Sequence, residues 1–301
     1  MIQHDYLIAG HRIRVEGDSL AEAVEAINGF GVFRKESGDE PLCRFVEAPF
    51  TADSAALSAD ATRLPDIDRV LYTSDIEGVR SCFGTKRGGG HLYGMVAEDG
   101  RILIVDMAAD FRTARFSGNM SERLLRFGCW IAYGLAVLPH KTVAIHTSTI
   151  RYRDRAVLFL GESGTGKSTH TRLWRENIEG ARLLNDDSPI IRIVDGRPVV
   201  YGSPWSGKTA CYKDESCPLA ACVRLSQAPH NKIVRLGVTA GYAALHPSCP
   251  PHLAYDDALY DFISEFLSDM LTAVPVYHLE CLPDADAARL SCNTIFGTCE
   301  K

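Results

Sequence analysis

Hydrophobic and polar residues alternate through the first part of the chain, in short runs separated by Gly, Asp and Pro. A period of two residues is typical of strands that bury one face. The last two of these runs flank Glu98-Asp99-Gly100, a sequence that favours a hairpin turn. The pattern therefore predicts a mostly antiparallel, β-rich N-terminal domain over residues 1–118.

The pattern changes at Ser121, which is a suitable helix N-cap. Apolar residues then recur at helical spacing until Pro139, which predicts a helix between these two residues. Two strands are expected next, over Thr142–Ile150 and Arg155–Gly161, and the second is almost entirely apolar. Because a continuous apolar strand suits a sheet covered on both faces, residues 119–301 are expected to form an α/β domain.

The C-terminal stretch supplies elements that would cover this sheet. A helix with one apolar side is expected from Asp256 to about Leu271. A strand follows it, and Asp284 then opens a short final helix.

The apolar strand runs into GESGTGKST, residues 161–169, which contains the Walker A spacing G-x-x-x-x-G-K-[ST]. A helix is predicted from Lys167, so the motif has the strand-loop-helix setting that its chemistry needs. Glycines let backbone N–H groups converge on a β-phosphate, and the helix N-terminus adds partial positive charge. Lys167 would bridge the β- and γ-phosphates, and Ser168 would place its hydroxyl on Mg²⁺. The predicted nucleotide-binding residues are Gly161, Ser163, Gly164, Thr165, Gly166, Lys167, Ser168 and Thr169.

Two adjacent acids follow the predicted helix, in a short strand that ends at Asn185-Asp186-Asp187. The carboxyl edge of a sheet is where strands deliver groups to a bound nucleotide. Side chains alternate along an extended strand, so one carboxylate can hold Mg²⁺ while the other faces an incoming hydroxyl. On these residues alone, an acidic turn ahead of the next strand is the alternative.

A second basic residue follows in GSPWSGK, residues 202–208. Lys208, on a short loop beside Pro204, would suit stabilisation of charge on a transferred phosphoryl group. A plain β-turn with a packed Trp205 explains the same residues equally well.

Taken together, GESGTGKST, LLNDDSPI and YGSPWSGK, preceded by His146 in IHTS, resemble the HPr serine kinase and phosphoenolpyruvate carboxykinase-like branch of P-loop enzymes. The resemblance covers roughly residues 142–282 and is nearest to the compact HPr-kinase-related members. It implies a P-loop kinase core preceded by the β-rich domain, and an ATP- and Mg²⁺-dependent kinase acting on a serine or a similar hydroxyl. It also implies that Asp186 handles the acceptor proton, that Asp187 helps to bind metal, and that His146 lies in the active site.

The chain also departs from this family. HPr kinases carry an arginine-containing signature after the DD strand, where this chain has GSPWSGKTA, so HPr itself is not indicated as the substrate. A guanine-reading N-K-x-D signature is missing, because Ile233 and Val234 follow Asn231-Lys232, and ATP is therefore favoured over GTP.

Composition narrows the partners and the compartment. A formal net charge of −6 without a Lys/Arg-rich run argues against a nucleic-acid partner. No apolar run approaches the roughly 18 residues of a membrane span, and the N-terminus lacks a signal-peptide pattern, so a cytoplasmic protein is expected. The ten cysteines are scattered singly, which favours reduced, buried thiols over zinc at Cys211, Cys217 and Cys222.

The sequence thus predicts an ATP-dependent phosphotransferase with Asp186, His146, Lys167 and Lys208 as catalytic residues and with Ser168 and Asp187 as metal ligands. The acceptor is a hydroxyl on a protein, a peptide or a small metabolite, and a homo-oligomer is compatible with the sequence. The alternative is a non-catalytic ATP-binding regulatory or assembly protein, which needs one metal-side acid but no second acid to meet a nucleophile.

Overall fold

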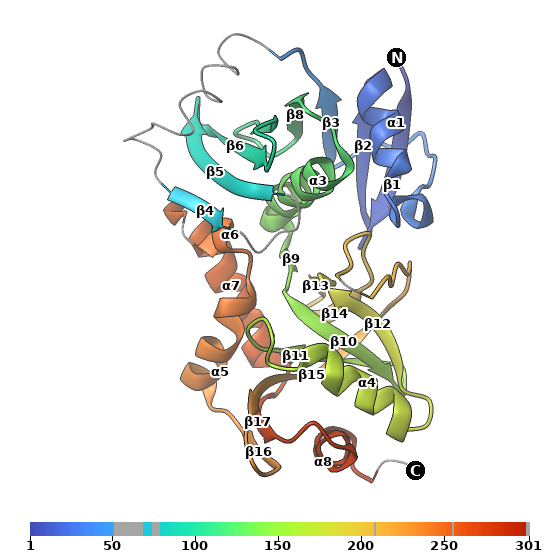
Figure 1. Cartoon of the computed structure of the whole chain (residues 1–301), viewed down its shortest axis with the longest axis vertical. Coiled ribbons are helices and arrows are strands. Elements are labelled where there is room, and N and C mark those ends of the chain that lie inside the picture. The colour runs from blue at the N-terminus through green and yellow to red at the C-terminus, as the bar shows by residue number, and fades with distance from the viewer. Residues whose placement is uncertain (51–68, 74–78, 208, 255, 299–301) are drawn as a thin grey trace. The chain divides into compact units, whose positions relative to one another are not determined.

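The computed structural model of the chain describes residues 1–50, 69–73, 79–207, 209–254 and 256–298 (Figure 1). The chain divides into two compact units, Met1–Pro139 and His140–Lys301. Both units combine sheets with helices, so the protein has a mixed α/β structure.

The first unit is built on an eight-stranded sheet in the described part of the chain, in the order β1-β2-β3-β8-β7-β6-β5-β4. The β2–β3 and β3–β8 pairs are parallel and the other neighbours are antiparallel. The strands are β1 Gln3–Ile8, β2 His11–Glu16, β3 Cys43–Glu47, β4 Arg69–Thr73, β5 Val79–Arg87, β6 Gly90–Ala97, β7 Ile102–Met107 and β8 Thr113–Gly118. The predicted hairpin is confirmed, because β6 and β7 pair across residues 98–100.

The described residues of this unit also contain α1 Asp18–Ala26, the 3₁₀ turn η1 Phe30–Phe33, and α3 Glu122–Val137. Helix α1 was not predicted from the sequence, although Leu20, Ala21 and Val24 lie at helical spacing and are buried. The unit is therefore a sheet with helices packed on it, not strands alone.

Helix α3 confirms the helix predicted between Ser121 and Pro139. Twelve of its 16 residues are buried. At Gly128 an added Cβ would lie 2.9 Å from a Leu103 methyl group, so glycine lets the helix approach β7 closely. Because α3 packs on this sheet, the division at Pro139 falls later than the boundary expected at residue 118.

The second unit contains a nine-stranded sheet in the described residues, with the path β12-β10-β11-β15-β14-β13-β9; β17 pairs with β15 and β16. Its strands are β9 Thr142–Ala144, β10 Thr147–Tyr152, β11 Arg155–Leu160, β12 Arg182–Asp187, β13 Ile190–Val194, β14 Arg197–Tyr201, β15 Ser216–Gln227, β16 Lys232–Arg235 and β17 Val276–Cys281. Its helices are α4 Lys167–Asn177, α5 Val238–Leu245, α6 Pro251–Ala254, α7 Asp257–Ala273 and α8 Ala285–Phe296, with the 3₁₀ turns η2 Leu138–His140, at the junction with the first unit, and η3 His246–Ser248.

Most of the elements predicted here are confirmed. Helix α4 begins at Lys167, α7 follows Asp256, and Asp284 caps α8 by accepting the Ala287 N–H. The single strand expected over Thr142–Ile150 was wrong, because residues 145 and 146 interrupt it and leave β9 and β10 in different parts of the sheet.

The core of this unit lies between the sheet and the helices α4 and α8 (Figure 1). Trp174 of α4 is fully buried, packs edge-on against Phe159, and donates its indole N–H to Ser291 of α8 over 2.9 Å. On β11, Phe159 belongs to this cluster, while Leu158 and Leu160 point to the other side and are also buried. The expectation of a strand covered on both faces is therefore confirmed.

Eight cysteines of the described residues are free thiols, and all except Cys281 are buried. Cys292 of α8 is disulfide-bonded, so the expectation of reduced thiols was wrong for this residue. Within the described residues, no group of His, Cys, Asp and Glu side chains forms a metal-binding cluster, and Cys211, Cys217 and Cys222 are not brought together as one.

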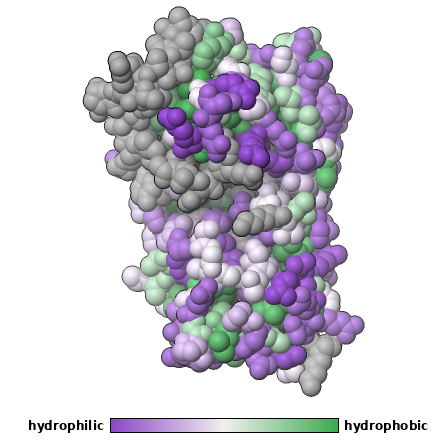
Figure 2. Space-filling view, viewed as in Figure 1, coloured by the Kyte–Doolittle hydropathy of each residue, from purple (hydrophilic) through white to green (hydrophobic). Residues whose placement is uncertain are grey.

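On the face drawn in Figure 2, hydrophilic residues are interspersed with smaller hydrophobic areas. Among the described residues, no helix has both the length and the apolar character needed to cross a membrane.

Candidate functional site

The direction of the strands explains why the predicted site residues meet. Strand β12 is antiparallel to β10, which is antiparallel to β11, so β12 and β11 run the same way. Strands β15 and β17 are parallel to β11. The carboxyl ends of β12, β11, β15 and β17 therefore lie at one edge of the sheet, where α/β proteins bind ligands.

The loop of residues 161–166 leaves β11 at this edge and enters α4. It depends on glycine. Gly161 has a φ of 151°, and an added Cβ would lie 2.4 Å from the Thr165 hydroxyl. Gly166, at φ 103°, precedes α4 and has no side chain with which to cap it, so the first backbone N–H groups of the helix can face an anion.

Lys167 closes this loop on itself. Its Nζ donates to the carbonyl oxygens of Gly161, over 2.7 Å, and Glu162, over 3.2 Å. The Thr165 hydroxyl also donates to the Glu162 carbonyl, while Ser163 is exposed. Desolvation lowers the pKa of Lys167, against the attraction of Asp187, Glu162 and Asp186. An anion held by the loop would therefore relieve an unfavourable charge.

Ser168 and Asp186 meet beside the loop. The Ser168 hydroxyl donates to both carboxylate oxygens of Asp186, at 3.2 and 3.4 Å, and Asp186 is only 6% exposed. Asp186 is held in place because it pairs with Ser148 on β10. A hydroxyl and a carboxylate are hard oxygen donors of the kind that Mg²⁺ prefers, so this pair fits the expected metal.

Asp187, the next residue, lies beside His146. Its Oδ1 lies 3.5 Å from Nε2 of His146, and both side chains are about half exposed, at 50% and 51%. His146 lies in the break between β9 and β10, so its side chain is free of the sheet pairing there. The backbone N–H of His146 donates to the Ser248 carbonyl over 2.8 Å. Asp187 has a φ of 119°, an unusual conformation for a residue with a side chain.

The pKa values of this pair shift in opposite directions. Desolvation raises the pKa of Asp187, helped by repulsion from Asp186 and opposed by His146 and Lys167. Desolvation and the Lys167 charge lower the pKa of His146, so its imidazole is favoured in the neutral form. A carboxylate with a raised pKa is a stronger base than an ordinary aspartate, so Asp187 is suited to accept a proton.

Two residues that support the site were not assigned roles from the sequence. Asn185 is fully buried and bonds to Ser203, Ser188 and the Trp205 carbonyl, which fastens the turn that follows the two acids. Its position immediately before the acids was the available signal. Trp205 is itself buried, whereas Lys208 lies outside the described residues.

Arg224 is the second such residue. It lies opposite Leu160 on the neighbouring strand β15, and its guanidinium donates to Glu162 of the loop over 2.7 Å and to the Ala244 carbonyl over 3.1 Å. This contact links the loop to β15 and α5. Only strand pairing brings the two residues together, so the sequence contained no signal for it.

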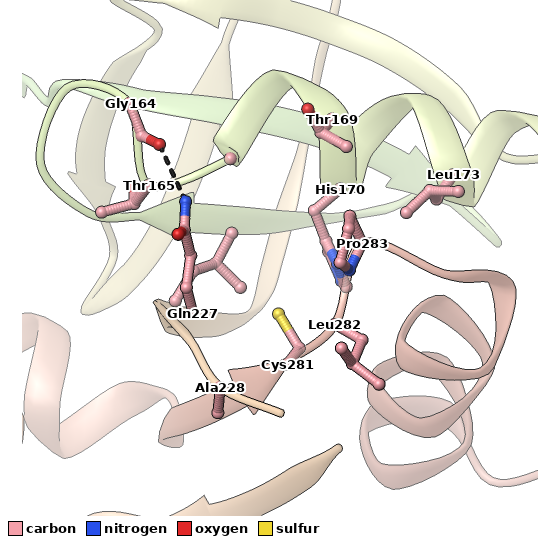
Figure 3. Close-up of a pocket in the computed structure, with 12 residues that line it drawn as sticks. Gly164, Thr165, Thr169, His170, Leu173, Gln227, Ala228, Cys281, Leu282 and Pro283 are labelled. Atoms are coloured by element: carbon pink, nitrogen blue, oxygen red, sulfur yellow. Dashed lines mark hydrogen bonds between the residues drawn. The ribbon is translucent and has the colours of Figure 1, made fainter. Parts of the chain in front are cut away.

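A pocket of about 540 Å³ lies at the ends of β15 and β17, which are on the other side of β11 from β12, the strand that carries the acids. One wall belongs to the loop and α4: Gly164, Thr165, Gly166, Thr169, His170 and Leu173. The other belongs to the ends of β15 and β17 and the residues after them: Leu225, Gln227, Ala228, Cys281, Leu282 and Pro283. Figure 3 shows the Gln227 amide donating to the Gly164 carbonyl, a bond of 3.2 Å, and the Cys281 sulfur pointing toward α4.

No protein-family model and no curated protein matches the sequence. Among solved structures, the chain is similar to the HPr(Ser) kinase/phosphatase from Coxiella burnetii, with 11% identity over 50% of this chain and 92% of that chain. The TM-score of this similarity is 0.30.

Proposed function

We propose that the second unit binds ATP with Mg²⁺ and transfers the γ-phosphoryl group to a hydroxyl of a protein, a peptide or a small metabolite. One observation carries the proposal: a glycine-dependent loop with Lys167 and Ser168 lies beside two carboxylates in different surroundings. Asp186 contacts the Ser168 hydroxyl, whereas Asp187 contacts His146.

These contacts favour an exchange of the roles expected for the two acids. Asp186 is the metal-side acid, because its carboxylate lies beside the Ser168 hydroxyl and both oxygens could bind the same Mg²⁺. Asp187 is the acceptor-side acid, because it is half exposed and an incoming hydroxyl can reach it. Bound Mg²⁺ would neutralise charge on the β- and γ-phosphates.

During phosphoryl transfer, the loop N–H groups and Lys167 hold the phosphates. Lys167 exchanges its hydrogen bonds to Gly161 and Glu162 for hydrogen bonds to phosphate oxygens. The acceptor oxygen forms a bond to the γ-phosphorus as the bond from that phosphorus to the β,γ-bridging oxygen breaks. Asp187 accepts the hydroxyl proton, and ADP leaves. His146 orients the Asp187 carboxylate.

The test is transfer of label from γ-labelled ATP to a cell extract fractionated into proteins, peptides and metabolites. We expect label in one fraction, its loss with EDTA, and its loss with Asp187→Asn. Labelling that survives thorough chelation would contradict the metal assignment. If ATP binds and no fraction is labelled, the protein holds ATP without transferring phosphate, as a regulatory or assembly protein would.

A further inference from the structure

The proposed function leaves open which part of the ligand occupies the pocket between α4 and the ends of β15 and β17. We infer that this pocket holds the nucleoside of the bound nucleotide and that its base is adenine. The inference rests on the proposed function, because it takes the loop of residues 161–166 as the phosphate site.

The layout of the strands sets the direction of the ligand. In the sheet, β10 and β12 lie on one side of β11, and β12 carries the acids; β15 and β17 lie on the other side of β11, and their ends line the pocket. A nucleotide with its phosphates in the loop has two ends, and the γ-phosphate must face the acids. Its nucleoside then lies on the opposite side, which is where the pocket is.

The shape of this side also fits. Leu160, the last residue of β11, pairs with Arg224, and β15 continues for three residues to Gln227, which pairs with Cys281 of β17. The two strands therefore extend past the start of the loop and form a wall beside it. The pocket volume of about 540 Å³ falls in the range of pockets that enclose small ligands.

The lining combines apolar surface with one amide. Leu225, Leu282 and Pro283 offer the apolar contacts that a flat aromatic base needs. Gln227 bonds to Gly164 through its amide nitrogen, which uses only one of the N–H groups of that amide. A glutamine amide pairs in two bonds with the N6 and N7 atoms of adenine, as a donor and an acceptor.

Guanine is disfavoured by the same lining. Its Watson–Crick edge presents two N–H donors, which a carboxylate satisfies best. The lining residues of the described pocket include no Asp or Glu. The pocket therefore matches adenine better than guanine.

The experiment measures three ligands on the full chain, each with Mg²⁺: ATP, GTP and inorganic tripolyphosphate, which lacks a nucleoside. Ala228→Phe fills the pocket from its wall, and Ala258→Phe, at an exposed position of α7 outside the lining, is the matched control. Titration calorimetry gives the affinities, and thermal unfolding checks the fold of each variant.

We expect Ala228→Phe to weaken ATP binding at least about tenfold and to leave tripolyphosphate binding within about twofold. Ala258→Phe should change neither. Gln227→Ala should lower the preference for ATP over GTP by about tenfold, again without an effect on tripolyphosphate.

Cys281 gives a second measurement that needs no variant, because its thiol is partly exposed and lines the pocket. ATP should slow alkylation of Cys281, followed by peptide mass, whereas tripolyphosphate should not.

The outcomes separate the two proposals. If wild-type protein binds both ATP and tripolyphosphate but Ala228→Phe leaves ATP binding unchanged, the nucleoside lies elsewhere and the proposed function stands. If Ala228→Phe weakens both ligands equally, the pocket acts through the loop and the inference is overturned. If wild-type protein binds neither ligand, the proposed function and this inference fail together.

Discussion

Asn substitutions at Asp187 and Asp186 test the division of labour between the two acids most directly. Each keeps the shape of the side chain and removes its charge. If Asp187 is the acid that takes the hydroxyl proton, Asp187→Asn should lower kcat by about 10²- to 10⁴-fold. That range corresponds to about 2.7 to 5.5 kcal/mol of barrier. The Kd of ATP·Mg²⁺ should change little, because the Ser168–Asp186 pair remains.

Asp186→Asn should give the opposite result. The Ser168 hydroxyl would lose its carboxylate partner, so Mg²⁺-dependent ATP binding itself should weaken. His146→Ala should have a smaller effect than Asp187→Asn. The His146–Asp187 contact is 3.5 Å long and both side chains are about half exposed. A contact of that kind is worth up to about 1 kcal/mol, or roughly fivefold in rate.

The pH profile supplies the independent readout. Because the pKa of Asp187 is raised, kcat/KM should fall as the pH drops through a value above the ordinary 3.8 of an aspartate. His146 opposes that rise, so His146→Ala should move this limb of the profile to higher pH, and Asp187→Asn should remove it.

The contribution of Asp187 to the stability of the fold should depend on pH in the opposite direction from kcat/KM. A raised carboxyl pKa means that the folded state favours the protonated form, so stability is lost as the pH rises through the folded pKa. Asp187→Asn should therefore raise the melting temperature of the nucleotide-free protein at pH 7. The rate and binding assays are steady-state kinetics and titration calorimetry. Loss of metal-dependent binding in Asp187→Asn, with normal binding and slow turnover in Asp186→Asn, would refute the assignment.

Three further predictions follow from the loop and from the two units. Lys167→Met should weaken ATP binding by at least about 1.5 to 3 kcal/mol. It should not lower the melting temperature, because desolvation already disfavours the charge of Lys167. An unchanged ATP affinity by calorimetry would remove the basis of the proposed function. Glu162→Gln should tighten ATP binding, because it removes a negative charge from the loop, and Arg224→Gln should weaken ATP binding. Each effect should be about 0.2 to 1 kcal/mol, since the pair is partly exposed. Effects of the same sign would contradict the idea that the charges of this pair act on the bound phosphates. A fragment of residues 140–301 should bind ATP, which calorimetry would measure. A fragment that begins at Ser121 should aggregate, because it exposes the apolar side of α3. Light scattering would compare the two fragments, and a longer fragment that stays monomeric would show that α3 packs differently.

Much of the region around the loop could be predicted because its signals are local. An apolar run, a glycine loop and helical spacing place β11 and α4 within one residue of their bounds in the structure. Helix α1 was missed even though its apolar residues have helical spacing, because the strand-like runs on either side dominated the interpretation of that segment. The break at His146 has no local signal, since its cause is a hydrogen bond to Ser248, far along the chain.

The chemical groups of the site can be identified from the sequence alone: the glycines, Lys167, Ser168 and two adjacent carboxylates at the end of a strand. It could not separate the two acids, because adjacent aspartates in one motif look alike. Only strand pairing did so, by turning Asp186 to Ser168 and Asp187 to His146. The pocket wall was equally a matter of tertiary structure, because Gln227 and Gly164 lie 63 residues apart in sequence and meet only when parallel strands align their carboxyl ends.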